Sequence, residues 1–93
     1  MDVCFSWDEA KRRLNLARHG LDFVDVLQVF DDATFTFEDE RFEYDERRYV
    51  TLGLLRGIVV TVVHTETASE IRVISLRRAT RNEQAIFFES LQD

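Results

Sequence analysis

The sequence predicts an α+β domain in which helices cover an antiparallel β-sheet, and two observations carry this prediction. Apolar residues recur at helical spacing near both ends of the chain, whereas its middle carries β-branched and aromatic residues at a period of two. The 93 residues contain no proline and suffice for one modest core, so no linker between domains is visible. We therefore expect a single domain over residues 1–93, with the element order β-α-α-β-β-β-β-α.

The first third of the chain predicts a short strand and two helices. Residues 3–7 form an apolar run, after which Asp8 can cap a helix and Gly20 can end it. Asp22 can then cap a second helix. Helical spacing predicts the buried positions of both helices: Ala10, Leu14, Ala17 and Leu21 in the first, and Phe23, Val26, Leu27 and Phe30 in the second.

Four strands and a last helix are expected in the remainder. The Arg56–Gly57 pair marks a tight turn between two of the strands. Thr80 and Glu83 fit a capping box, which predicts a helix running to about Leu91 with Ala79, Ile86 and Phe87 facing the core. The strands are expected at residues 33–39, 46–55, 58–64 and 71–76.

Charge excludes some classes of function. The net charge of −6 argues against a direct DNA-binding protein, which should be basic. The acidity is local, because residues 21–50 hold ten acids against three arginines. These acids solvate a loop and edge strands, or they face a basic protein partner. With no apolar run long enough for a bilayer and no secretory signal, we expect a cytoplasmic protein without a membrane anchor.

A polar stripe on the first helix is the strongest candidate site. Lys11, Asn15, Arg18 and His19 recur at helical spacing, so a cation, an amide and an imidazole share one helix face and could hold a phosphate. Lys11 is the only lysine in the chain. Two of these residues also have a purely structural explanation: Lys11 as an exposed cation and His19 as a cap for the last carbonyls of the helix.

Arginines near the last strand are the second candidate. By strict alternation Arg72 and Arg77 face opposite sides of that strand, so a regular strand cannot present both to one phosphate. We favour Arg77, beside the start of the last helix, as the phosphate clamp, with Arg72 second. Arg47 is a further candidate RNA contact. His64 ends a buried strand and is expected as a core or edge histidine rather than a catalyst, and two histidines with one cysteine offer no transition-metal site.

The order of these residues resembles the BrnT family of bacterial toxins over nearly the whole chain. The resemblance rests on Trp7-Asp8, Lys11, Asn15, His19-Gly20, Phe23, Val29-Phe30-Asp31, Glu46-Arg47, Gly53, the run 71–77, Ala79 and Glu83. It implies a RelE-like fold and a metal-independent endoribonuclease that inhibits translation and growth. It also implies a BrnA-type antitoxin that neutralises the toxin in a hetero-oligomer and alone contacts the operator DNA.

Metal-free RNA cleavage needs the 2′-hydroxyl to attack its own phosphate, with help for the proton and for the charge on phosphorus. We expect Lys11, His19 and Arg77 to be catalytic and Asn15, Arg18, Arg47 and Arg72 to bind RNA. No metal or cofactor is expected. The general base remains open among Lys11, His19 and water.

The chain departs from the family pattern on its last helix, and this supports an alternative. Gln84 stands where arginine is usual and Phe87 where tyrosine is usual. If those side chains touch RNA in relatives, activity is reduced here. The alternative function is therefore a catalytically weak or inactive toxin fold that binds an antitoxin and takes part in operon autoregulation.

Overall fold

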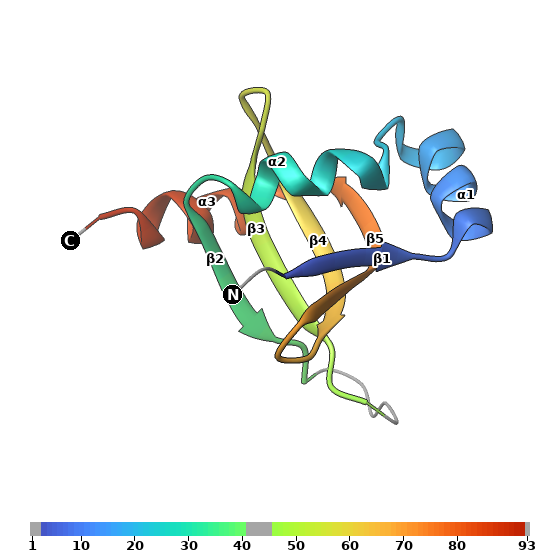
Figure 1. Ribbon diagram of the computed structural model, residues 1–93. Coiled ribbons are helices and arrows are strands. Elements are labelled where there is room, and N and C mark those ends of the chain that lie inside the picture. Colours follow the sequence, from blue (N-terminus) through green and yellow to red (C-terminus); the bar gives the residue numbers. More distant parts are fainter. Residues whose placement is uncertain (1–2, 41–45, 93) are drawn as a thin grey trace.

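A five-stranded sheet, in the order β1-β5-β4-β3-β2, organises the computed structural model, which describes residues 3–40 and 46–92 (Figure 1). The strands are β1 (Cys4–Trp7), β2 (Thr34–Glu38), β3 (Tyr49–Leu55), β4 (Ile58–Glu66) and β5 (Glu70–Arg78). The helices are α1 (Glu9–His19), the 3-10 helix η1 (Phe23–Asp25), α2 (Val26–Phe30) and α3 (Arg81–Ser90). No helix in the described part of the chain is long and apolar enough to cross a membrane.

The α+β class is confirmed, but the sheet is mixed rather than antiparallel. β2 to β5 pair antiparallel, whereas β1 pairs parallel with the first half of β5, from Cys4 opposite Glu70 to Trp7 opposite Val73. β1 and β5 lie far apart in the sequence, so no tight hairpin turn forces them to be antiparallel. Beyond Val73 no strand of the described residues pairs with the outer edge of β5.

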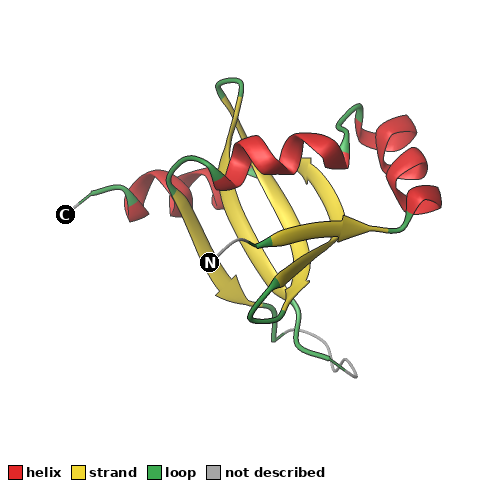
Figure 2. Ribbon diagram, in the orientation of Figure 1, coloured by secondary structure: helices red, strands yellow, loops and turns green. Residues whose placement is uncertain are grey.

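Helices cover the sheet on both faces, with α2 in front and α3 behind in the view of Figures 1 and 2. One core cluster lies beneath η1 and α2, and the other lies beneath α3. The first contains Leu21, Phe23, Val26, Val29, Leu55, Val60, Val62, Val73 and Leu76; the second contains Val50, Leu52, Val59, Ala79 and Phe87. Two small apolar layers thus share one sheet.

The helix ends follow the predicted caps. Asp8 accepts a hydrogen bond from the Lys11 N–H at 3.0 Å, and Gly20 adopts the left-handed conformation (φ 70°) that ends α1. Thr80 and Glu83 form the predicted capping box. Asp22 caps the 3-10 helix η1, with α2 continuing from it, where the sequence predicted one α-helix.

The predicted apolar stripe of α1 is wrong. Of its four members only Leu21 is buried, whereas Leu14 is 65% exposed. The reason is that α1 lies at the β5 edge of the sheet rather than on a face, so it has little apolar surface to cover. Leu27, also expected in the core, is 46% exposed.

A glycine allows α2 to lie close against β3. A Cβ atom at Gly53 would stand 2.7 Å from Cγ1 of Val29 and 3.3 Å from Cγ2 of Thr34. Val29 is fully buried, so it cannot move aside without disturbing the first core cluster.

We expect Gly53→Ala to lower the free energy of unfolding by about 1–3 kcal/mol through overpacking, as measured by urea denaturation. Val29→Ala in the same chain should remove the clashing methyl groups, so the double variant should lose less than the sum of the single losses. Strict additivity of the two variants would contradict this close packing.

A row of hydrogen-bonded polar side chains connects the neighbouring strands β4, β3 and β2. His64 is fully buried, as predicted, and its Nε2 lies 2.7 Å from Thr51 Oγ1, which in turn lies 2.7 Å from Thr36 Oγ1. The imidazole stacks on Tyr49 and meets Phe30 edge-on. Burial in this setting lowers the pKa of His64, because it disfavours the charged ring.

A lowered His64 pKa means that the unfolded chain binds the proton more readily than the folded one. The fold favours neutral His64, so its contribution to the free energy of unfolding is complete above the ordinary histidine pKa of about 6.5 and is lost as pH falls below it. We expect the parent to lose more stability than His64→Gln between about pH 8 and about pH 5 in urea titrations. Equal losses in the two proteins would contradict this linkage.

Candidate functional site

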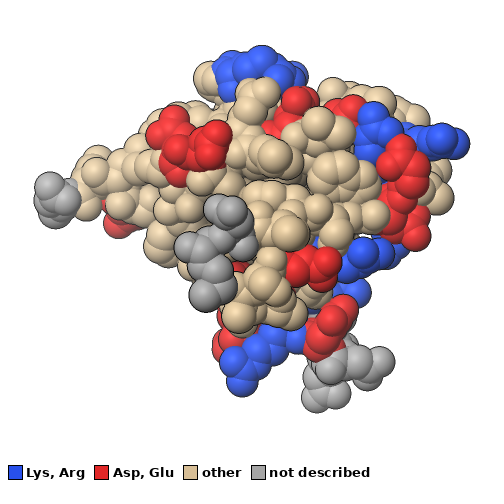
Figure 3. Space-filling model, viewed as in Figure 1, with Lys and Arg blue, Asp and Glu red and all other residues tan. Residues whose placement is uncertain are grey.

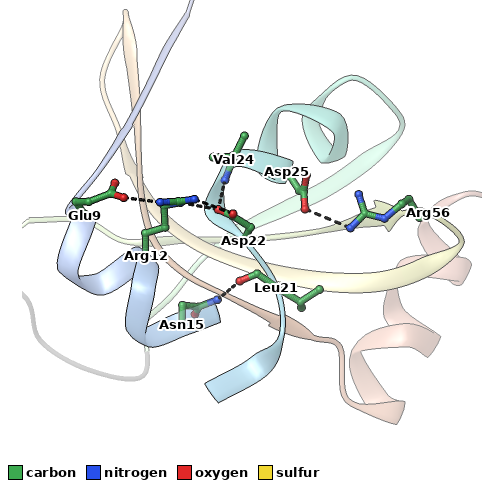
Figure 4. Close-up of polar contacts among 8 residues, drawn as sticks. All are labelled: Glu9, Arg12, Asn15, Leu21, Asp22, Val24, Asp25 and Arg56. Carbon is green, nitrogen blue, oxygen red and sulfur yellow. Dashed lines mark hydrogen bonds and ion pairs between the residues drawn. The ribbon is translucent and has the colours of Figure 1, made fainter. Parts of the chain in front are cut away.

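A single buried amide fixes α1 to the free edge of β5. Asn15 is the only buried residue of α1. Its Nδ2 donates hydrogen bonds to the carbonyl oxygens of Leu76 (2.7 Å) and Leu21 (3.0 Å), and its Oδ1 accepts one from the Leu76 N–H at 3.2 Å. Figure 4 shows the bond to Leu21. The side-chain amide thus pairs with Leu76 as the peptide group of a neighbouring strand would.

A β-bulge lies next to this anchor. Val63 pairs with Ser75 and His64 pairs with Val73, so Ile74 is an extra residue in β5. Since the bulge reverses the alternation of side chains, Leu76 is buried on the same face as Val73. No sequence pattern marked this bulge.

The bulge also corrects the predicted placement of two arginines. Arg72 pairs with Thr65 and Arg77 with Thr61, and both threonines lie on the α3 face of the regular strand β4. Arg72 and Arg77 therefore share a face, contrary to strict alternation. They are still roughly 15 Å apart along the strand, too far to clamp one phosphate together.

A surface cavity of about 200 Å³ forms where α1 meets the bulge. It collects all four members of the predicted polar stripe, together with three residues that sequence analysis did not assign to the site. Its lining is Lys11, Leu14, Asn15, Arg18, His19, Ile74 and Ser75. Leu14, which the sequence predicted to be buried in the core, instead forms an apolar wall of the cavity. Ile74 and Ser75 line the cavity at the bulge of β5.

The basic side chains of this cavity have no acidic partner in the part of the chain that the structure describes. Neither Lys11, Arg18 nor His19 forms an ion pair with any residue that the structure describes, and no carboxylate lines the cavity. Arg18 and His19 lie in the last turn of α1, where the helix dipole favours positive charge. The cavity therefore presents positive charge to solvent, although the whole chain is acidic.

The neighbouring face of α1 behaves in the opposite way. Arg12 contacts Glu9 and donates to both carboxylate oxygens of Asp22, at 2.7 and 3.0 Å (Figure 4). The Arg12 side-chain bond is the main cause that lowers the pKa of Asp22. Figure 3 shows acidic and basic groups side by side over α1. Arg12 ties α1 to η1 and is not available to a ligand.

Arg77 does not reach the cavity. Its guanidinium donates to Glu83 Oε1 at 2.7 Å and to Oε2 at 2.9 Å, and Glu83 also accepts from the Thr61 hydroxyl and the Thr80 N–H. Burial raises the pKa of Glu83, but these hydrogen bonds outweigh it and hold the pKa at about 2. The predicted clamp is thus part of a joint between β4, β5 and α3.

The structure separates the remaining candidates from the cavity as well. Arg72 is exposed in β5, two residues before Ile74. Arg47 has a side chain that is 76% exposed and stands 4.0 Å from Glu38, at the β2–β3 side of the sheet. On α3, Gln84 bonds the Ala79 carbonyl and Phe87 is fully buried, so Phe87 cannot contact RNA.

Fold and site together define a small α+β protein with a surface cavity that is lined by the cations Lys11 and Arg18 and is large enough for a phosphate group. The chain matches the family model of the ribonuclease toxin BrnT of type II toxin–antitoxin systems over residues 7–83. No curated protein matches it. The protein therefore belongs to the BrnT family of ribonuclease toxins, which implies an RNA target and an antitoxin partner.

The Asn15 anchor makes a testable contribution to stability. Asn15→Ala leaves one N–H and two carbonyl groups without their partner, so we expect the free energy of unfolding to fall by about 2–4 kcal/mol in urea titrations. The matched control is Asn82→Ala, an exposed asparagine of α3, which should change stability little. Similar small losses for both variants would remove Asn15 from its anchoring role.

Proposed function

We propose that this chain is a metal-independent endoribonuclease that inhibits translation by cleaving RNA, with the α1 cavity as its active site. The single observation that carries the proposal is the set of unpaired cations at this cavity, held in place by the Asn15 bonds to β5. Phosphodiester RNA is the anionic substrate that such a site suits.

The proposed reaction is attack of a ribose 2′-hydroxyl on the adjacent phosphorus, with departure of the 5′-oxygen. Arg18 and Lys11 stabilise the negative charge that grows on the phosphoryl oxygens, because both cations face the cavity without a competing carboxylate. His19 is placed to exchange a proton with the 2′-hydroxyl or the leaving oxygen, since imidazole can do so near neutral pH. Lys11 and water are the other candidate bases.

In this proposal Asn15 and Arg77 are positioning residues rather than catalytic ones. Asn15 sets the height of α1 against the bulge, and its polar atoms are already occupied by backbone groups. Arg77 holds α3 on the sheet through Glu83. Arg72 extends the cationic surface along β5 towards flanking nucleotides, while Arg47 is reached only by RNA that passes over the sheet.

The cavity lining supports metal independence, because hard cations such as Mg²⁺ bind through carboxylate oxygens and the lining offers none. The resemblance to BrnT further supports a RelE-like arrangement and a BrnA-type antitoxin that neutralises the chain in a cytoplasmic hetero-oligomer. The second candidate, an antitoxin-binding module without catalysis, is favoured by Gln84 and Phe87, because an amide and a buried phenyl ring stand where the family usually has arginine and tyrosine.

The test is cleavage of a defined messenger RNA by antitoxin-free protein in EDTA. We expect the parent to cleave, and Lys11→Ala and His19→Ala each to lower the rate by about 100-fold or more. The matched control is Arg13→Ala, which removes an exposed cation of the same helix outside the cavity and should retain most of the activity.

Two outcomes would change the assignment. If Arg77→Ala stays folded but loses cleavage while Lys11→Ala retains it, the site lies at the joint between β5 and α3. If the folded parent does not cleave while a related toxin does so in the same assay, the antitoxin-binding module replaces the enzyme.

A further inference from the structure

The edge of the sheet opposite α1 is open. β2 is the last strand of the sheet formed by the described residues, and all five of its residues are exposed. An edge strand presents unpaired N–H and C=O groups in a row and can accept another strand from a second polypeptide. The strand carries no proline and no lysine, two devices that commonly block such pairing.

Aromatic side chains stand beside this open edge. Phe35 and Phe37 pair with Leu52 and Val50, so they extend the second core cluster outwards on the α3 face. Each is 37% exposed, and their ring centroids are 6.0 Å apart. Phe35 also lines a shallow cavity of about 230 Å³ with Ile86, Glu89 and Ser90 of α3. The second core cluster thus continues to the surface here.

Acidic groups frame the same strand. Asp31 and Asp32 precede β2, Glu38 ends it and Glu40 follows, all of them exposed, and Glu89 lies at the α3 wall of the cavity. Figure 3 shows acidic groups over the connection from α2 to β2. Arg47 stands 4.0 Å from Glu38. The backbone edge, the two phenylalanines and this acidic frame are together called the β2 docking surface.

We propose that the β2 docking surface binds an extended segment of the antitoxin, which adds to the sheet as a strand beside β2. Apolar side chains of that segment cover Phe35 and Phe37, and lysines or arginines flanking them face the acidic frame. The choice of occupant follows from charge: a second copy of this chain would bring its own acidic frame, and RNA would be repelled. The proposal rests on the proposed function only for the existence of an antitoxin.

The sheet order separates this surface from the catalytic cavity. β2 and the β5–α1 region lie at opposite lateral edges of the sheet, so a strand added to β2 does not itself enter the cavity. Antitoxin binding and RNA cleavage should therefore respond to different substitutions. A toxin altered only at β2 should still cleave RNA and yet escape neutralisation.

The test is titration calorimetry with the separately purified antitoxin encoded in the same operon. We expect Phe35→Ser and Glu40→Lys each to raise the dissociation constant of the antitoxin complex by about tenfold or more. Neither variant should reduce RNA cleavage. The matched control is Leu27→Ser, an apolar residue of α2 with 46% exposure outside this surface, which should bind like the parent. In hydrogen exchange, amides of β2 should gain protection in the complex.

Unchanged affinity in both variants, or β2 amides that exchange in the complex as in the free protein, would overturn the proposal. So would no binding by the parent, or a self-association of the chain that Phe35→Ser abolishes. Failure of the parent to bind the antitoxin, with its RNA cleavage intact, counts against this surface only. Absence of cleavage with normal binding counts against the enzymatic function only.

Discussion

The two-pronged hydrogen bond between the Asn15 amide and the Leu76 peptide is the contact on which the site depends. β1 covers only the first half of β5, and Asn15 satisfies both peptide groups of Leu76 beyond that point. Because these groups are buried, leaving them without a hydrogen-bond partner would lower the free energy of unfolding by the full cost of their desolvation. The amide therefore holds α1 at one height beside the bulge, and with it the positions of Lys11, Arg18 and His19.

Three arginines form ion pairs that connect different segments of the fold, whereas the cations at the cavity have no acid partner among the described residues. Arg12 pairs with Asp22 and Arg56 with Asp25 (Figure 4), and Arg77 pairs with Glu83. Each pair joins two different segments of the fold. The Arg56 side chain is 60% exposed, so its pair contributes at most about 1 kcal/mol, whereas the pairs of Arg12 and Arg77 are partly buried; all three fix geometry. Lys11 and Arg18, which have no acid partner among the described residues, both line the cavity, and this explains how a chain of net charge −6 can offer a site for an anion.

The two edges of the sheet are treated differently. On one side α1 and the Asn15 amide close the edge of β5, and a cationic cavity results. On the other side β2 stays open between aromatic and acidic side chains. This polarity suits a protein that needs to meet an anionic substrate and a protein partner at separate places.

The sequence by itself determined the class of fold, the caps of α1 and α3, the buried His64 and the polar stripe that lines the cavity. These features depend on residues within one helical turn or one strand, where spacing and capping chemistry are local. Only the tertiary structure decided that β1 runs parallel to β5, that α1 lies at an edge with Leu14 exposed, and that Ile74 bulges. It also decided that Arg77 meets Glu83 instead of the cavity. The physical reason is that these outcomes depend on which distant groups satisfy one another, and periodicity carries no information about partners far along the chain.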